Sequence, residues 1–218
     1  MKEYGETIFD ILYILICFIA GIYLLKNSKN KNHKIMGLST LLLVLGDSFH
    51  LIPRMLDYFI DYDFTTFLGI GKLITSITMT IFYLLIYKLY LNVYKANENK
   101  NLSYLIYFLV FLRICLCLMP QNRWLTNDSS LLLGVIRNIP FLILGIIIIY
   151  LFYKNRKGIK SLKHIWFYVI LSFAFYIPVV ILASAIPIFG MFMLPKTICY
   201  VLIIMSYIKF MKEEKWVI

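Results

Sequence analysis

Apolar runs of about 20 residues recur along nearly the whole of this 218-residue chain, and they restrict its fold more than any other feature. A helix of about 20 apolar residues spans the hydrocarbon core of a bilayer, where the backbone must satisfy its own hydrogen bonds. The sequence therefore predicts an all-α integral membrane protein. Seven segments are expected to be transmembrane helices, namely 7–25, 35–58, 65–91, 102–119, 130–153, 163–184 and 188–210.

The connections between these segments are short, and none is long enough for a separate soluble domain of about 50 residues. We expect one transmembrane domain over residues 1–218, with consecutive helices antiparallel. The first seven residues include Glu3 and Glu6 and no small-residue cleavage site. The first apolar run is therefore expected to remain as a span and not to be a cleaved signal peptide.

Basic residues gather in the first, third and fifth connections and after the last span, whereas the other side holds most of the acidic residues. The positive-inside rule then predicts an outer N-terminus and a cytoplasmic C-terminus, as in a multi-pass protein of a cell membrane, here a bacterial plasma membrane. Most of the positive charge behind the net +11 lies in these short connections, which is the pattern of membrane orientation. No nucleic-acid partner is therefore expected. The basic connections comprise Lys26, Lys29, Lys31, Lys34, Lys95, Lys100, Lys154, Arg156, Lys157, Lys160 and Lys163.

Five further cations lie inside the predicted spans, all in the half nearer the outer surface, where the positive-inside rule does not explain them. A charge in hydrocarbon costs several kcal/mol, so five at one level predict a water-accessible cationic pocket. Such a pocket favours a phosphate or carboxylate ligand. The alternative is that each long side chain extends to the headgroups separately. The candidate ligand-binding residues are Arg54, Lys72, Arg113, Arg137 and Lys196, together with Tyr200 one turn after Lys196.

Span 35–58 carries an acid, an imidazole and a guanidinium on one helical face. Asp47, His50 and Arg54 occur at positions i, i+3 and i+7, with Asp47 near the middle of the bilayer. We interpret Asp47 and His50 as a proton relay or an acid–base pair. The alternative is a structural network that fixes this helix against its neighbours.

Landmarks in the first three spans are repeated in the last three. Lys72 follows Pro53 by 19 residues, and Lys196 follows Pro178 by 18. The spacing predicts a parallel three-plus-one-plus-three repeat, although equal helix lengths and common residues can produce such matches by chance. Transporter sites characteristically lie between repeats of this kind. The predicted units are repeats 7–91 and 130–212 and a linker helix 102–119.

The size, the orientation and the three-plus-one-plus-three plan resemble those of the SWEET and PQ-loop transporters and of the KDEL receptor. Arg54-Met55-Leu56-Asp57 is similar to an Arg-x-x-Asp in the second helix of the KDEL receptor. The chain departs from the PQ-loop pattern because its Pro-Gln pair, Pro120-Gln121, lies in an outer connection. The resemblance implies a central cavity between two three-helix bundles, with alternating access or ligand capture.

Two main functions fit these residues. The first is a transporter or receptor for a small anionic solute or an anionic lipid headgroup, in which Lys72 and Lys196 clamp the anion and Arg54 and Arg137 assist. The second is an intramembrane hydrolase or transferase acting on a phospho- or acyl-lipid, with the pair in span 35–58 as acid and base.

Other classes are less favoured. Ceramidase-like hydrolases use several intramembrane histidines for zinc, but here only His50 lies deep in a span, and the four cysteines show no metal spacing. A retinal protein is suggested by Lys196 and by the Tyr-Ile-Pro-Val-Val run of residues 176–180, but span 65–91 has no carboxylate counter-ion. An accessory or signalling membrane protein stays open. We expect no metal and no cofactor, with membrane lipids and the anionic ligand as partners.

Overall fold

The structure, a computed structural model, describes residues 2–95, 99–183 and 185–215, and these form helices and no strand. Seven helices are long and apolar enough to cross a membrane, which confirms the expected all-helical, multi-pass membrane protein. The predicted spans and the helices differ by at most five residues at either end. The elements are α1 (Lys2–Lys26), α2 (Lys31–Asp57), α3 (Thr65–Val93), α4 (Lys100–Leu118), η1 (Pro120–Asn122), α5 (Leu131–Lys154), α6 (Ile165–Leu182), η2 (Pro187–Phe192) and α7 (Met193–Lys215).

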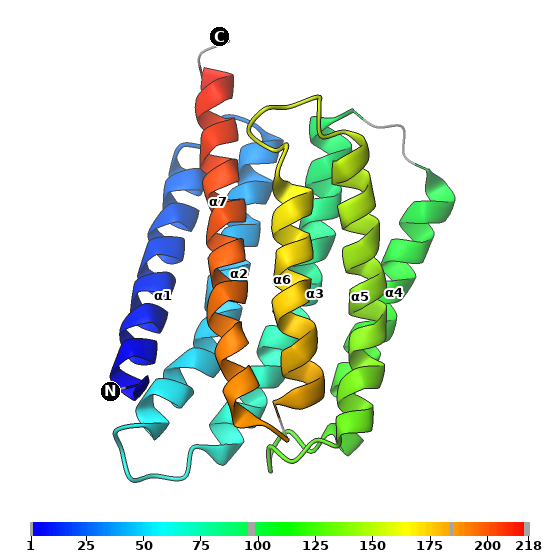
Figure 1. Cartoon of the computed structure of the whole chain (residues 1–218). Coiled ribbons are helices and arrows are strands. Elements are labelled where there is room, and N and C mark those ends of the chain that lie inside the picture. Colours follow the sequence, from blue (N-terminus) through cyan, green and yellow to red (C-terminus); the bar gives the residue numbers. More distant parts are fainter. Residues whose placement is uncertain (1, 96–98, 184, 216–218) are drawn as a thin grey trace.

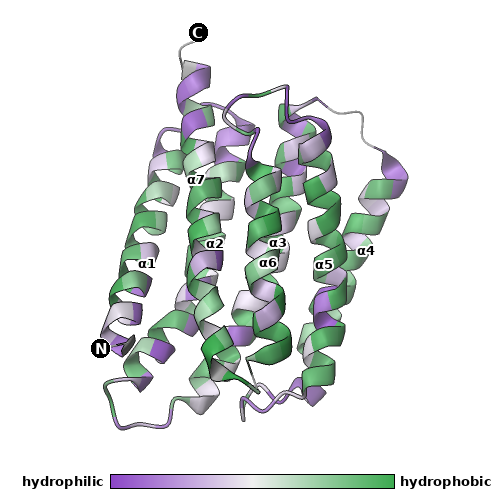
Figure 2. Cartoon of the chain, viewed as in Figure 1, coloured by the Kyte–Doolittle hydropathy of each residue, from purple (hydrophilic) through white to green (hydrophobic). Residues whose placement is uncertain are grey.

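The helices run up and down in one bundle (Figure 1). One end, here called the N-terminal face, carries the start of α1 and the α2–α3, α4–α5 and α6–α7 connections. The packing contacts link six helices in a ring, in the order α1, α2, α3, α5, α6, α7 and back to α1, while α4 packs on α3 and α5. Hydrophobic residues dominate the middle of the helices, with hydrophilic ones concentrated towards both ends (Figure 2).

Three helices begin at a side chain that caps their first turn. The Asn30 side chain accepts a hydrogen bond from the backbone N–H of His33 (2.9 Å) at the start of α2. Asn99 and Ser130 cap α4 and α5 in the same way. Asn and Ser are preferred there because their side chains satisfy backbone donors that have no partner within the helix.

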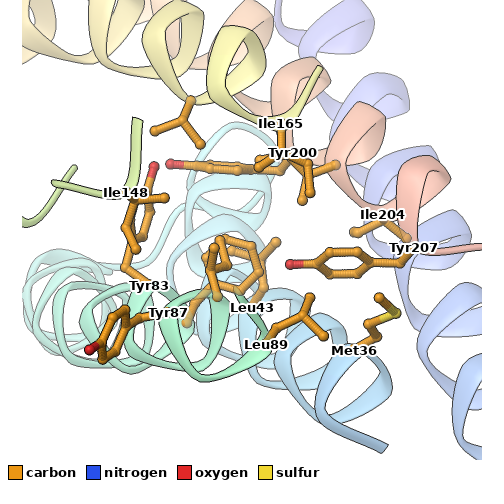
Figure 3. Close-up of a cluster of buried hydrophobic side chains, with 14 of the residues drawn as sticks. Met36, Leu43, Tyr83, Tyr87, Leu89, Ile148, Ile165, Tyr200, Ile204 and Tyr207 are labelled. Atoms are coloured by element: carbon orange, nitrogen blue, oxygen red, sulfur yellow. The ribbon is translucent and has the colours of Figure 1, made fainter. Parts of the chain in front are cut away.

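Aromatic side chains fill the centre of the bundle. Tyr83 of α3 packs on Phe141 of α5 and Phe173 of α6, with ring centroids 4.9 and 5.7 Å apart. The hydroxyls of Tyr83 and Tyr200 point towards one another (Figure 3), and the Tyr83 hydroxyl lies 3.3 Å from Oγ of Ser172. This packing links α3, α5, α6 and α7 through one aromatic cluster.

Glycines bring α2 and α3 into backbone contact. A Cβ atom added to Gly71 would overlap the carbonyl oxygen of Phe49 and lie 2.7 Å from Cα of His50. The Thr75 hydroxyl also donates to the carbonyl of Gly46 (2.9 Å). Small residues allow such close approach between membrane helices. The contact fixes the positions on α2 and α3 from which the polar side chains described next extend.

Candidate functional site

A cavity of about 410 Å³ with both polar and apolar lining opens between α2, α3, α4, α5, α6 and α7, near the N-terminal face, and the α4–α5 connection forms part of its wall. Four cationic side chains line it, one from each of α3, α4, α5 and α7. No carboxylate is found among the described residues of the lining. The cations are Lys72, Arg113, Arg137 and Lys196.

Arg113 is the most buried of the four, at 2% exposure. Its guanidinium carbon lies 3.5 Å from the centroid of the Phe141 ring, a cation–π contact. Its Nε and Nη1 atoms are buried and form no hydrogen bond of normal geometry within the described part of the chain, although the Cys117 thiol and the Tyr176 hydroxyl lie close to the guanidinium. A buried donor without an acceptor costs about 1–3 kcal/mol, so these two N–H groups favour an acceptor in the cavity.

Arg137 of α5 is held by the α4–α5 connection. Its Nη1 donates to Oδ1 of Asn122 (2.7 Å) and to Oγ of Ser129 (2.8 Å), and its guanidinium carbon lies 4.5 Å from the Trp124 ring. Asn122 in turn donates through Nδ2 to the carbonyl of Leu116 (2.7 Å), which anchors the connection to the end of α4. These partners orient the guanidinium, but they are neutral and leave its charge uncompensated.

The hydrogen-bond and ring partners of the two lysines are also neutral, although the Asp47 carboxylate of α2 lies near enough to attract the Lys196 ammonium group. Nζ of Lys72 donates to Oδ1 of Asn127 (2.8 Å). Lys196 is 8% exposed, and its Nζ lies 4.3 Å from the centroid of the Tyr176 ring and 5.6 Å from that of Tyr200. The ion pairs found within the described ranges involve none of the four cavity cations.

Arg54 stands apart from the cationic cavity, although the sequence analysis grouped it there. It is not among the lining residues, and its guanidinium forms an ion pair with Glu6 of α1. Nε of Arg54 also donates to the Tyr58 hydroxyl (3.1 Å), which itself donates to Glu6 (3.1 Å). The sequence prediction missed this pairing because it began the first span after Glu6. In the structure α1 begins at Lys2, so Glu6 lies within the helix and compensates the charge of Arg54.

Asp47 and His50 have different surroundings. The Asp47 carboxylate accepts a hydrogen bond from the Tyr13 hydroxyl of α1 (2.7 Å), and Asp47 does not line the cavity. His50 does line it, and its Nδ1 atom is buried with no hydrogen-bond partner among the described residues. Tyr200 also lies outside the lining, at 2% exposure in the aromatic core behind Lys196.

Several lining residues were not predicted, and five of them belong to the α4–α5 connection. They are Asn122, Trp124, Asn127, Ser129 and Ser130. Two residues of this connection, Arg123 and Asn127, adopt positive φ angles of 49° and 51°, which turn the chain back against the helix ends. The sequence feature that could have indicated these lining residues was the density of amide and hydroxyl side chains around a tryptophan. Within the described ranges, no group of three or more His, Cys, Asp or Glu residues could hold a metal ion.

Comparison with known proteins finds no match, since no protein family matches the chain and no curated protein or solved structure is significantly similar to it. The function must therefore be argued from the chemistry of the cavity.

Proposed function

We propose that the cavity binds a compact anion, the phosphate or carboxylate of a small solute or of a lipid headgroup, and that the protein transports or captures it from the outer side of the membrane. The observation that carries this proposal is the set of four cations on one cavity without a carboxylate in the described lining. A volume of about 410 Å³ is within the roughly 300–1,000 Å³ typical of small-ligand sites.

Electrostatic repulsion gives the four cations a reason to bind an anion. Arg137 lies near enough to Lys72, and Arg113 near enough to Lys196, for their like charges to repel. Two unit charges about 9 Å apart repel by roughly 2 kcal/mol at an effective dielectric constant of 20. An anion between them replaces this repulsion with attraction to each cation. Its oxygens would also accept from Nε and Nη1 of Arg113, two donors that form no hydrogen bond of normal geometry with the described residues.

The aromatic and amide neighbours supply orientation. Phe141 and Trp124 lie against the guanidinium groups of Arg113 and Arg137, so each planar donor group is held in one plane. Bidentate recognition of phosphate or carboxylate depends on such a fixed plane. Lys72 and Lys196 contribute charge without a fixed direction.

The parallel repeat with an outer N-terminus belongs to the same proposal. Each contact in one half of the six-helix ring has a counterpart in the other half. The α1–α2 contact corresponds to α5–α6, α2–α3 to α6–α7, and α3–α5 to α7–α1. Gly21 lies against the following helix at Leu41, and Gly145 lies against the following helix at Phe173. The matched lysines of α3 and α7 line one cavity, as a site between two repeats requires.

Proton coupling, if present, involves His50 more directly than Asp47, because His50 lines the cavity while the Asp47 carboxylate is bonded to Tyr13. The same geometry gives the hydrolase alternative less support. An acid–base pair must reach one substrate, and only one member of this pair lines the cavity.

The test is equilibrium binding of radiolabelled inorganic phosphate to the purified full chain in detergent, with sulfate and acetate as competitors. Arg113→Met, Arg137→Met and Lys196→Met should each weaken phosphate binding at least tenfold. Arg54→Met is the matched control, because Arg54 is an intramembrane arginine paired outside the cavity, and it should change binding less than twofold. Equal losses in Arg54→Met and the cavity variants, or no measurable binding of any of the three anions, would refute the proposal.

A further inference from the structure

An apolar groove of about 110 Å³ lies between α5 and α6, which are neighbours in the bundle (Figure 1). Ile139 of α5 is 49% exposed, and Ile177 and Ile181 of α6 are 38% and 44% exposed. These helices span the membrane, so exposed isoleucines of this kind contact lipid chains. The residues that line only this groove are Val135, Ile139, Leu142, Phe173, Ile177 and Ile181.

The groove and the cationic cavity share one wall. Asn138, Tyr176 and Val180 line both spaces. The Tyr176 hydroxyl donates to Oδ1 of Asn138 (2.8 Å), which links α6 to α5 across this wall. On the cavity side, Nζ of Lys196 lies 4.3 Å from the centroid of the Tyr176 ring. A single aromatic side chain therefore separates the lipid-facing groove from a buried ammonium group.

The two helices are weakened where this wall lies. Pro140 follows Asn138 by two residues, and Pro178 follows Tyr176 by two. Each proline lies inside its helix and lacks the N–H that would bond to the carbonyl four residues earlier. The buried residues of α6 all lie between Ile165 and Phe173, so its half nearer the N-terminal face has none. Separation of α5 and α6 here breaks the Tyr176–Asn138 hydrogen bond and the edge contact between the rings of Tyr176 and Phe141, whose centroids lie 6.1 Å apart.

We propose that the groove is a lateral entrance to the cavity and that the ligand is an anionic phospholipid. Its phosphate binds Arg113, Arg137 and Lys196, the first part of an acyl chain occupies the groove, and the Asn138–Tyr176 hydrogen bond opens as the lipid passes. This inference rests on the proposed anion site. A soluble anion needs no apolar extension of its site, whereas a lipid needs an anion site and an apolar groove that are continuous with each other.

Binding of two probes separates the groove from the cavity. The probes are inorganic phosphate and fluorescently labelled phosphatidic acid, each measured with the full chain in maltoside micelles. Ile177→Trp and Ile139→Trp fill the groove from α6 and from α5 without changing a cavity-lining residue. Ile170→Trp is the matched control, because Ile170 lies on α6, is also 38% exposed and lines neither space.

Both groove variants should bind phosphatidic acid at least tenfold more weakly and inorganic phosphate within twofold of the native chain, while Ile170→Trp should leave both unchanged. If Ile177→Trp and Ile139→Trp bind phosphatidic acid normally, or lose phosphate in parallel, the groove is not a lipid site, although the anion site stands. If the native chain binds neither probe, the proposed function and this inference fail together.

Discussion

Removing the most buried charge of the cavity should stabilise the protein while abolishing its ligand site. The variant is Arg113→Met, which keeps an unbranched side chain of similar length beside Phe141. Two buried donors without acceptors cost about 1–3 kcal/mol each, and the cation–π contact offsets about 2 kcal/mol of that cost. The net gain is about 0–4 kcal/mol with a middle value of about 2 kcal/mol, comparable to the gain from replacing buried ionic groups by apolar ones.

At about 2–4 °C per kcal/mol for a chain of this size, a gain of about 2 kcal/mol should raise the unfolding temperature of Arg113→Met by roughly 4–8 °C. The assay is thermal unfolding in detergent, in a buffer free of phosphate and sulfate. Arg137→Met is the control, because its loss leaves Oδ1 of Asn122 and Oγ of Ser129 without a donor, and its unfolding temperature should fall. Added phosphate should raise the unfolding temperature of the native chain more than that of Arg113→Met. A lower unfolding temperature for Arg113→Met without anion would show that its guanidinium is already satisfied, and the argument for an empty acceptor position would fail.

Three further predictions concern the helices and the pair on α2. Gly71→Ala should lower stability by about 1–3 kcal/mol, because the added Cβ meets backbone atoms of α2. Gly5→Ala is the control, because Gly5 has open space around it, and it should be neutral or slightly stabilising in the same thermal assay. Tyr13→Phe removes the donor to Asp47 and should cost about 1–3 kcal/mol, more than Asp47→Asn, which keeps an acceptor for Tyr13; equal losses would contradict this. In the proposed site, anion binding favours protonation of His50, so sulfate affinity should increase as the pH falls from about 8 to 5. His50→Ala should remove this dependence of affinity on pH. A native affinity that does not change over this range would rule out the link between anion binding and protonation.

The spans were predictable from the sequence because charged and turn-forming residues interrupt apolar runs of the required length. The cations inside them were equally visible, since each stands in an apolar stretch. The sequence did not show which of these cations share one cavity. Periodicity assigns a residue to a face of its own helix, but it does not say which helix that face meets. Arg54 shows the limit, because its partner Glu6 lies 48 residues earlier and just outside the predicted span.

The α4–α5 connection was the least predictable part of the site. Asn122, Trp124 and Asn127 lie in a polar stretch that reads as an ordinary turn region. Their role depends on the chain folding back against the end of α4, where Asn122 and Trp124 both donate to backbone carbonyls of that helix. Such a fold-back is a tertiary event, set by hydrogen bonds between segments, and local propensity does not encode it.

The glycine contacts between α2 and α3 have a mechanical consequence for the bundle. At Gly71 the neighbouring atoms of α2 belong to the backbone, so no change of rotamer can make or absorb space between these two helices. We therefore expect α2 and α3, with His50 and Lys72, to keep their relative position if the bundle rearranges. A change in the width of the cavity must come from the opposite wall, where α6 has no buried residue beyond Phe173. In the proposed site, a larger ligand would therefore be accommodated by displacement of α6 and not of the α2–α3 pair.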